Sequence, residues 1–406
     1  MYRRTLTFIT LRGARSRYAS RPPGPRMAWE CRNWTGRALP ARRRPLEVKF
    51  AMFRIGARIA RLFGSLTLAL MLAACSDTDR ALEKANPIQP LPKPPLGISS
   101  SFADLETPPT PERVRLGRWL FFDRRLSVDN TVSCATCHEP RNAFSQLTAH
   151  ATGILNQAGK RKSPTFVNCA WPVSPVFFWD GRAKSLEDQA LGPIENPVEM
   201  GNTHTAMIAS LEKIQGYRPY FKQAFGTPEI TKERVARAVA DYERTRMSGN
   251  SPWDRWQAGD TAAVDARVRI GHWVFHARAA CARCHLGENF SDSQFHNIGV
   301  GWDSTRAAFA DSGRVLISKN PKDTGAFKTP TLREVARHPP YMHDGSQATL
   351  REVVEFYNRG GHPNPHLSDK IGPLNLTDEQ QDALVAFMEA LNGEGYADSM
   401  PALFPQ

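Results

Sequence analysis

The chain has 406 residues and a formal net charge of +13, and this length allows two or three domains. The excess positive charge lies in residues 1–74, where 16 of the 53 Lys and Arg residues face only two carboxylates, Glu30 and Glu47. The remaining 37 basic and 38 acidic residues nearly cancel. Composition therefore predicts no basic groove and no nucleic-acid partner for the folded part.

The N-terminal segment is typical of an export signal. We expect residues 1–51, which are rich in Arg and Pro, to lie upstream of the true start. Residues 52–74 have a basic start and an apolar run that ends in Leu-Ala-Ala before Cys75, a pattern that resembles a bacterial lipobox. We therefore expect 52–74 to be a lipoprotein signal peptide and Cys75 to carry a lipid anchor facing the periplasm. A cleaved signal or a single anchoring helix is the alternative, although the run is short for a full span.

Residues 75–105 are expected to form a tether, because their Pro-rich run does not favour a helix. The chain beyond is mostly helical in pattern, with long loops and few strand signals. Thr110 followed by Pro111 and Glu112 predicts the start of a helix. A capping box at residues 377–380 predicts another. Further helices fit the segments 205–225, 231–247 and 261–278.

Two copies of Cys-x-x-Cys-His carry the strongest chemical signal. They are Cys134, Cys137 and His138, and Cys281, Cys284 and His285. This spacing attaches a c-type haem through two thioether bonds, with the His as the proximal iron ligand. Cys-x-x-Cys alone also fits a zinc half-site or a dithiol redox pair, but the His after each pair favours haem. The motifs predict two covalently bound haem c groups.

One Cys of the mature chain remains outside these motifs and the lipobox. Cys169 stands in an apolar stretch, which predicts a buried, inert thiol rather than a reactive one.

The chain also repeats itself around the two motifs. Residues 115–121 match 269–275, and 162–165 match 328–331. Trp179-Asp180-Gly181 likewise matches His343-Asp344-Gly345. Three matching blocks in the same order indicate a tandem duplication. We therefore predict an all-α fold of two tandem cytochrome c-like haem domains with long loops, an N-terminal domain over 106–250 and a C-terminal domain over 251–406.

These blocks, with residues 192–200 and 341–345, resemble the bacterial dihaem cytochrome c peroxidase and MauG family over about residues 106–392. The resemblance implies that hydrogen peroxide reacts at the N-terminal haem and that the C-terminal haem passes electrons. Glu199 matches the family's distal acid/base, Gln189 its distal Gln, and Trp179 a relay between the haems. Without the resemblance, these would be a loop carboxylate, a polar helix surface and a packed core aromatic.

Two departures from the peroxidase pattern concern the iron ligands. In many dihaem peroxidases a His sixteen residues after the proximal His caps the peroxidatic iron, and here that position is Ile154. We expect a five-coordinate N-terminal haem, with His150 either a substitute ligand or a solvated loop residue. Tyr357 stands where many peroxidases have Met, as in MauG. The resemblance implies that Tyr357 binds the C-terminal iron and lowers its potential, whereas in isolation it would be a core aromatic.

A third departure concerns the calcium ion that the family binds between its domains. The Asn expected there is Lys162, and the Thr of a backbone position is His338, while Pro340 is retained. Because an ammonium group competes with a cation, we expect calcium to bind weakly or to be replaced by Lys162.

The sequence thus predicts a periplasmic, lipid-anchored peroxidase that receives electrons from a small cytochrome c or cupredoxin. A MauG-like enzyme that uses peroxide to oxidise a residue of a partner protein is the alternative, and Ile154 and Tyr357 favour it. A non-enzymatic dihaem electron carrier is a third interpretation, against which Glu199 and Gln189 count. A homodimer is a further expectation, since many relatives dimerise.

Overall fold

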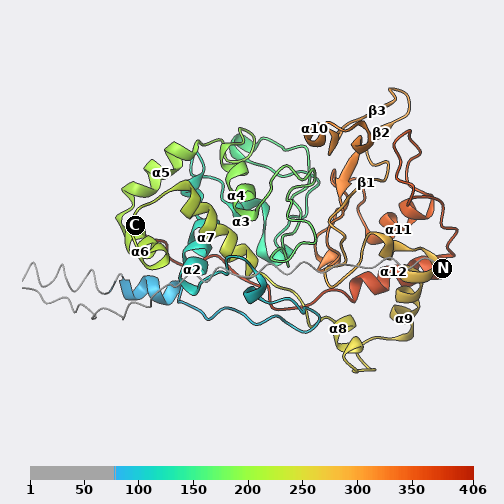
Figure 1. The fold of residues 1–406 in the computed structure, drawn as a ribbon, viewed down its shortest axis with the longest axis horizontal. Helices are drawn as coiled ribbons and strands as arrows, with labels where there is room; N and C mark the ends of the chain where they lie inside the picture. The colour runs from blue at the N-terminus through green and yellow to red at the C-terminus, as the bar shows by residue number, and fades with distance from the viewer. Residues whose placement is uncertain (1–76, 78) are drawn as a thin grey trace, which may run out of the picture. The chain divides into compact units, whose positions relative to one another are not determined.

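The computed structural model describes residues 77 and 79–406, so the predicted signal peptide and Cys75 lie outside the described residues. Helices alternate with long loops (Figure 1). From residue 86 on, the α-helices are α2 (Pro111–Phe122), α3 (Cys134–Cys137), α4 (Leu186–Glu195), α5 (His204–Lys213), α6 (Arg218–Phe225), α7 (Lys232–Arg244), α8 (Pro252–Gln257), α9 (Ala266–Trp273), α10 (Val315–Ser318), α11 (Leu350–Asn358) and α12 (Asp378–Glu389). Within the described part of the chain, none of the helices combines the length and apolar character that a membrane span needs.

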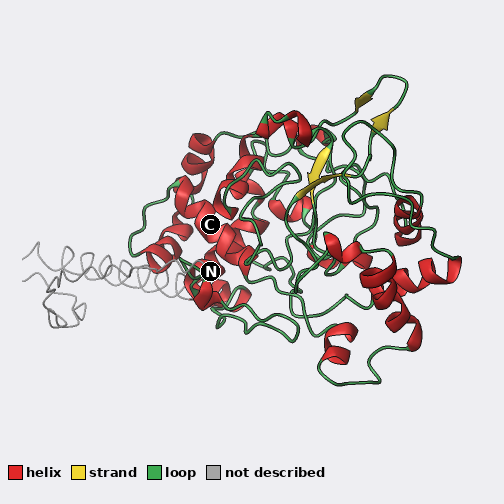
Figure 2. Cartoon of the chain, turned by 45° about the vertical axis from the view of Figure 1, so that its right-hand side comes forward, coloured by secondary structure: helices red, strands yellow, loops and turns green. Residues whose placement is uncertain are grey.

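The all-α expectation is too strict, because two small antiparallel sheets accompany the helices (Figure 2). Strand β1 (Phe295–Asn297) pairs with β4 (Ala326–Lys328), and β2 (Trp302–Asp303) pairs with β3 (Ala308–Phe309). Each strand has two or three residues, which is too short for an alternating pattern to mark it in the sequence. The fold is mostly helical with few strands.

The predicted helix starts are confirmed where a capping residue marks them. The Thr110 hydroxyl accepts a hydrogen bond from the backbone N–H of Arg113 at the start of α2. The capping box of Thr377 and Gln380 is present at the start of α12. Such side chains satisfy backbone N–H groups that have no partner inside the helix.

Two other predicted helices differ from the structure, one by an interruption and one at its ends. The segment 205–225 is two helices, α5 and α6, separated by a 3-10 turn at Gln215–Tyr217. The segment 261–278 becomes helical only at Ala266, after the N-cap Asp265, and its last turn is a π-helix over Val274–Arg278.

The apolar side chains form two main clusters. The first contains the helices α2 and α4 to α7, with Trp119, Phe121 and Tyr242 fully buried. The second contains α8, α9, α11 and α12, with Phe275 and Phe387 buried. The domain boundaries at 106–250 and 251–406 remain a prediction.

In each cluster, a glycine of the repeated block lies where two helices cross. A Cβ atom on Gly117 of α2 would lie 1.8 Å from the carbonyl oxygen of Ala238 in α7. A Cβ atom on Gly271 of α9 would lie 1.9 Å from the carbonyl oxygen of Ala383 in α12. Only glycine allows such close backbone contact, so the repeated glycine sets the same helix crossing twice.

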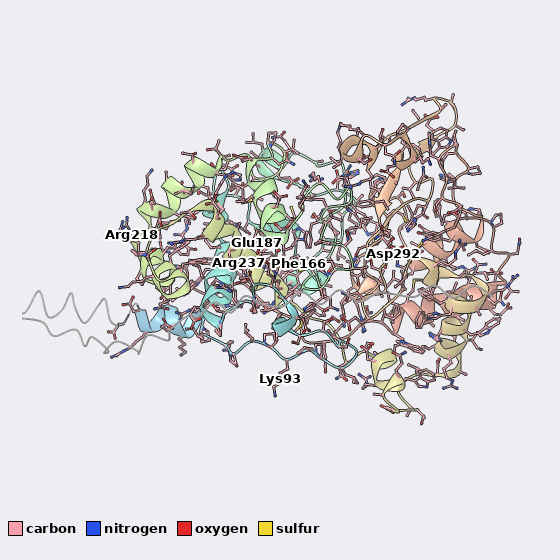
Figure 3. All side chains as sticks on the ribbon, viewed as in Figure 1. Lys93, Phe166, Glu187, Arg218, Arg237 and Asp292 are labelled. Carbon is pink, nitrogen blue, oxygen red and sulfur yellow. The ribbon has the colours of Figure 1, made fainter. Side chains whose placement is uncertain are left out.

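Half-buried ion pairs join α4 to α7 in the first cluster. Glu187 and Arg237 lie next to each other (Figure 3), with 3.2 Å between their charged atoms, and Arg244 reaches the same carboxylate at 2.8 Å. Arg244 also contacts Asp241 at 3.1 Å. These contacts hold α4, the helix that carries Gln189, against α7.

The Pro-rich segment packs on the folded part instead of extending from it as a tether. Asn86 is buried and donates from its side chain to the carbonyl of Arg115 at 3.0 Å. The hydroxyl and backbone N–H of Ser99 donate to Glu288. The carbonyl of Gly97 accepts from Arg333, which forms a buried ion pair with Asp254. From Asn86 on, the segment is therefore part of the folded unit.

Candidate haem-binding and peroxide site

The first Cys-x-x-Cys-His motif forms one helical turn, α3, that ends at His138. The His138 Nδ1 atom lies 2.9 Å from the carbonyl oxygen of Phe144. Because a carbonyl only accepts hydrogen bonds, Nδ1 carries the hydrogen and Nε2 keeps a free lone pair. Burial lowers the pKa of His138, which keeps the ring neutral. A neutral imidazole with an oriented Nε2 is the form that ligates a metal.

The second motif has the same geometry. His285 Nδ1 lies 2.9 Å from the carbonyl oxygen of Phe290, and burial lowers the pKa of His285. The repeated block after each motif braces this loop through two hydroxyl groups. In the first repeat the Ser145 hydroxyl donates to the Ser163 carbonyl at 2.6 Å, and the Thr165 hydroxyl donates to the Ala143 carbonyl at 2.6 Å. In the second repeat the Ser291 hydroxyl donates to the Thr329 carbonyl at 2.7 Å, and the Thr331 hydroxyl donates to the Asn289 carbonyl at 2.7 Å. The internal repeat predicted from the sequence is thus confirmed in geometry.

A large cavity opens over the second motif. Cys281, Cys284 and His285 line it, and so does Tyr357 of α11. Burial, and then the charges of the two Cys, raise the pKa of the Tyr357 hydroxyl. Most other lining side chains are apolar, so the cavity fits a flat, apolar macrocycle held by the two thiols. The residues present therefore fit a haem c.

Glu199 lies near the first motif, on the loop that follows α4. Its Oε1 accepts a hydrogen bond from the Asn196 side chain at 2.6 Å. Burial raises the pKa of Glu199, while the charge of Arg182 and the bond from Asn196 act in the opposite direction. Burial and then the charge of Glu199 raise the pKa of the Cys137 thiol to about 11. The carboxyl group is thus partly desolvated and close to the predicted haem-attachment site.

Ile154 occupies a fixed place beside Glu199. Its side chain is buried, and its backbone N–H donates to the Glu199 carbonyl at 2.9 Å. A Cβ atom on Gly201 would overlap the Ile154 Cδ1 atom, so the side chain fills the space against that glycine. His150 is exposed, as expected for a solvated loop residue, and Gln189 is half-buried on α4. The roles of these residues remain predictions.

Trp179 joins the two repeated loops. Its indole Nε1–H donates to the carbonyl of Lys162 at 2.8 Å, and its own carbonyl accepts from the backbone N–H of Lys328 at 2.8 Å. The ring also faces the edge of His343, with 6.4 Å between ring centroids. Because Trp179 lines the cavity of the second motif, it contacts both repeats at the wall of that cavity.

Lys162 and His338 also line this cavity. Lys162 is only 4% exposed, and its ammonium group donates to the carbonyl of Gln146. Burial lowers the pKa of Lys162 to about 8. Burial and then the charge of Lys162 lower the pKa of His338 to about 4. The predicted calcium position thus contains a buried ammonium group.

Two residues of the first site were missed by the sequence analysis. Arg182 places its guanidinium 3.6 Å from the Phe178 ring centroid and bonds Asp180, and its charge acts on Glu199. Asn196 orients the carboxylate. Asn196 stands within the block 192–200 and Arg182 directly follows Trp179-Asp180-Gly181, but nothing in their spacing marks a contact with Glu199.

Cys169, predicted to be buried and inert, is half-buried in the structure. Burial is the main cause that raises the pKa of its thiol, which keeps the sulfur protonated and poorly nucleophilic.

A family model for di-haem cytochrome c peroxidase matches residues 111–262. The methylamine utilization protein MauG of Methylorubrum extorquens is 40% identical over 299 residues, which cover 73% of this chain and 82% of that protein. Cytochrome-c peroxidase IdrP1 of Denitromonas iodatirespirans is 37% identical over 358 residues, which cover 81% of this chain and 93% of that protein.

Two solved structures have a similar fold. A MauG-like protein associated with microbial copper homeostasis superposes with a TM-score of 0.66 at 28% identity, over 76% of this chain and 95% of that one. The diheme peroxidase BthA from Burkholderia thailandensis, at 23% identity and a TM-score of 0.62, has a similar fold over 75% of this chain and 92% of its own.

Proposed function

Because the chain belongs to the dihaem cytochrome c peroxidase and MauG family, we propose that it reduces hydrogen peroxide at a haem held by Cys134, Cys137 and His138. A second haem, held by Cys281, Cys284 and His285, relays the electrons. The protein is an oxidoreductase that acts on peroxide. The single observation that carries the N-terminal assignment is the partly desolvated Glu199 carboxyl beside the first motif.

The chain's own residues account for the proton transfers. Peroxide reduction consumes two electrons and two protons and yields two waters. Glu199 would accept a proton from one oxygen of the peroxide and return it to the other oxygen, so that this second oxygen leaves as water. Asn196 holds Oε1 in place for this exchange. The haem iron, when bound, supplies the electron transfer that cleaves the oxygen–oxygen bond.

We further propose that the N-terminal iron has an open distal position in the resting enzyme. Ile154 has no atom that binds iron, and the hydrogen bond from its backbone to Glu199 holds the loop in place. One equivalent of hydrogen peroxide added to the diferric holoenzyme should change the Soret band at once. A spectrum that changes only after reduction of one haem would contradict the proposal.

A matched pair of variants tests the same point. Ile154→His places an imidazole at the buried position and should make the peroxide reaction depend on prior reduction. Leu155→His places the same group at the next residue, which is 79% exposed, and should leave the reaction unchanged.

A MauG-like oxidation of a partner protein is the second candidate, and Tyr357 and Trp179 favour it. We propose Tyr357 as the distal ligand of the C-terminal iron, because it lines the same cavity as His285. The Trp179 N–H donates to a backbone carbonyl, which is too weak a base to take its proton. An electron removed from the indole would then be replaced without any proton transfer, as a relay requires.

Turnover with a reduced donor separates the two candidates. Rapid peroxide-dependent oxidation of a small cytochrome c or cupredoxin supports the peroxidase. Slow donor oxidation, together with peroxide-dependent modification of Trp or Tyr on an exported partner, supports the MauG-like enzyme. In either case Trp179→Phe should slow the electron transfer, whereas Trp171→Phe should not.

Export and anchoring follow from the predicted signal peptide. We propose that the protein is periplasmic and that lipid on Cys75 holds it at a membrane. Cys75→Ser should move the protein from the membrane fraction to the soluble periplasmic fraction without loss of haem. Wild-type protein that is already soluble would contradict the anchor.

We also propose that no calcium is needed between the two repeats. The Lys162 ammonium occupies the position of the expected ligand and bonds a carbonyl that a cation could otherwise use. Metal analysis of the purified holoenzyme should find iron without stoichiometric calcium, and one tightly held calcium per chain would contradict this proposal.

A further inference from the structure

Several buried polar atoms of residues close to the Lys162 ammonium group have no hydrogen-bond partner among the described residues. They are the Nε2 atom of Gln146 and both ring nitrogens of His338. The ammonium group of Lys162 donates to the carbonyl of Gln146 and retains two further N–H groups. Buried polar groups rarely stay unpaired, because desolvation without a replacement bond is costly. These atoms therefore indicate a bound group.

The charge of the cavity indicates which kind of group it is. None of the described residues that line the cavity is Asp or Glu. Its charged lining residues are Lys162, Arg283, Lys328 and Lys370. Ammonium and amide N–H groups donate to anions and offer nothing to a cation. The occupant is therefore an apolar body that carries carboxylates.

We propose that Lys162, Gln146 and His338 form the receptor for a propionate carboxylate of the C-terminal haem. The inference rests on the proposed haem attachment at Cys281 and Cys284, whose side chains line the same cavity as Lys162 and His338. Lys162 then has two roles, because its carbonyl also accepts the hydrogen bond from the Trp179 indole. One residue positions the haem carboxylate and the indole together.

The receptor makes Lys162 a positioning residue that tunes the second haem. A positive charge beside the propionate favours the reduced iron, so its removal should lower the reduction potential of the C-terminal haem. Lys162→Met should lower that potential, and Lys162→Arg should restore it. Gln146→Leu removes a donor but no charge, so it should give a smaller shift in the same direction.

The test is a spectroelectrochemical titration of the holoenzyme at several pH values. Lys160→Met is the matched control, because this lysine is two residues away and exposed, and it should leave the potential unchanged. Lys328→Met tests the equivalent residue of the second repeat. A shift with Lys328→Met but not with Lys162→Met would overturn the assignment.

Covalent haem is counted by mass spectrometry before each titration. Wild-type protein without two haems would refute the proposed function, whereas Lys162→Met protein with two haems and an unchanged potential would refute this inference alone. If Lys162→Met does not fold, Gln146→Leu and Lys162→Arg decide the question by the same readout. A Lys162-dependent potential that varies with chloride concentration would indicate a mobile anion and also overturn the proposal.

Discussion

Glu199 combines a partly desolvated position with a single oriented hydrogen bond, and this combination suits an acid/base group. Glu199→Gln keeps the shape and removes the proton acceptor. We expect the rate of peroxide reduction to fall by roughly 10²–10⁴-fold with both haems retained. Stopped-flow measurement of peroxide consumption checks this. Glu195→Gln, at the exposed end of α4, is the control and should keep the wild-type rate.

The charge of Arg182 leads to a prediction for the pH dependence of peroxide reduction, because it acts on the pKa of Glu199. Burial raises the pKa of Glu199, so the rate should fall on the acid side as the carboxylate takes up a proton. The charge of Arg182 opposes that shift, and its removal leaves the pKa higher still. The acid limb of kcat/KM in Arg182→Gln should therefore move to higher pH. An acid limb at the same pH in both proteins would show that another group controls it.

At the residue scale, the sequence predicts which residues carry the chemistry better than it predicts how their side chains are oriented. The spacing of His138 behind Cys134 and Cys137 identifies the haem ligand without a structure. The carbonyl of Phe144 that orients the ring could not be predicted, because a backbone acceptor has no sequence signature. The same holds for Trp179, since its partner is the carbonyl of Lys162.

At the scale of helices, the repeated glycine gives a stability prediction. Gly271→Ala places a Cβ atom 1.9 Å from the Ala383 carbonyl oxygen, so α9 and α12 must move apart. Overpacking of this kind costs about 1–3 kcal/mol, and thermal denaturation should show it as a lower Tm. Gly159→Ala is the control, because its Cβ atom would lie 3.5 Å from the nearest atom, the Ala151 carbonyl oxygen, which is an ordinary van der Waals contact. Equal Tm values for the two variants would contradict the close crossing.

The helices that the sequence predicts well begin at side-chain caps. Thr110 and Thr377 mark α2 and α12 because their hydroxyls bond the first turn. The predicted start at residue 261 is wrong because the capping side chain is that of Asp265, so that α9 begins at Ala266. The strands β1 and β4 are held by pairing across 29 residues of chain or more, and such pairing leaves no local pattern.

At the scale of the whole molecule, the described chain is tied together by contacts far apart in sequence. The Pro-rich segment illustrates this, because its composition predicts a tether while Gly97 and Ser99 bond Arg333 and Glu288. Composition describes the local stiffness of a segment, but whether it docks depends on partners elsewhere in the chain. The same limit applies to Lys162, whose buried environment is built by both repeats.

A buried carboxyl group gives the last prediction, which concerns global stability. Glu243 of α7 is 5% exposed, and its Oε2 has no partner in the described structure. Burial raises the pKa of Glu243 to about 8, so the folded protein keeps a proton that the unfolded chain releases above its ordinary carboxyl pKa. The free energy of unfolding should therefore fall as pH rises from about 4.5 to about 8.

Glu243→Gln removes this proton linkage while keeping the size of the side chain. Relative to wild type, the variant should gain stability with rising pH, reaching roughly a few kcal/mol by the upper end of that range. Thermal denaturation of both holoproteins at several pH values measures the difference. Glu229→Gln, an exposed change, should follow the wild-type curve. Parallel curves for Glu243→Gln and wild type would mean that Glu243 is ionised in the folded protein and is stabilised there by a partner such as Arg244, whose charge lowers its pKa.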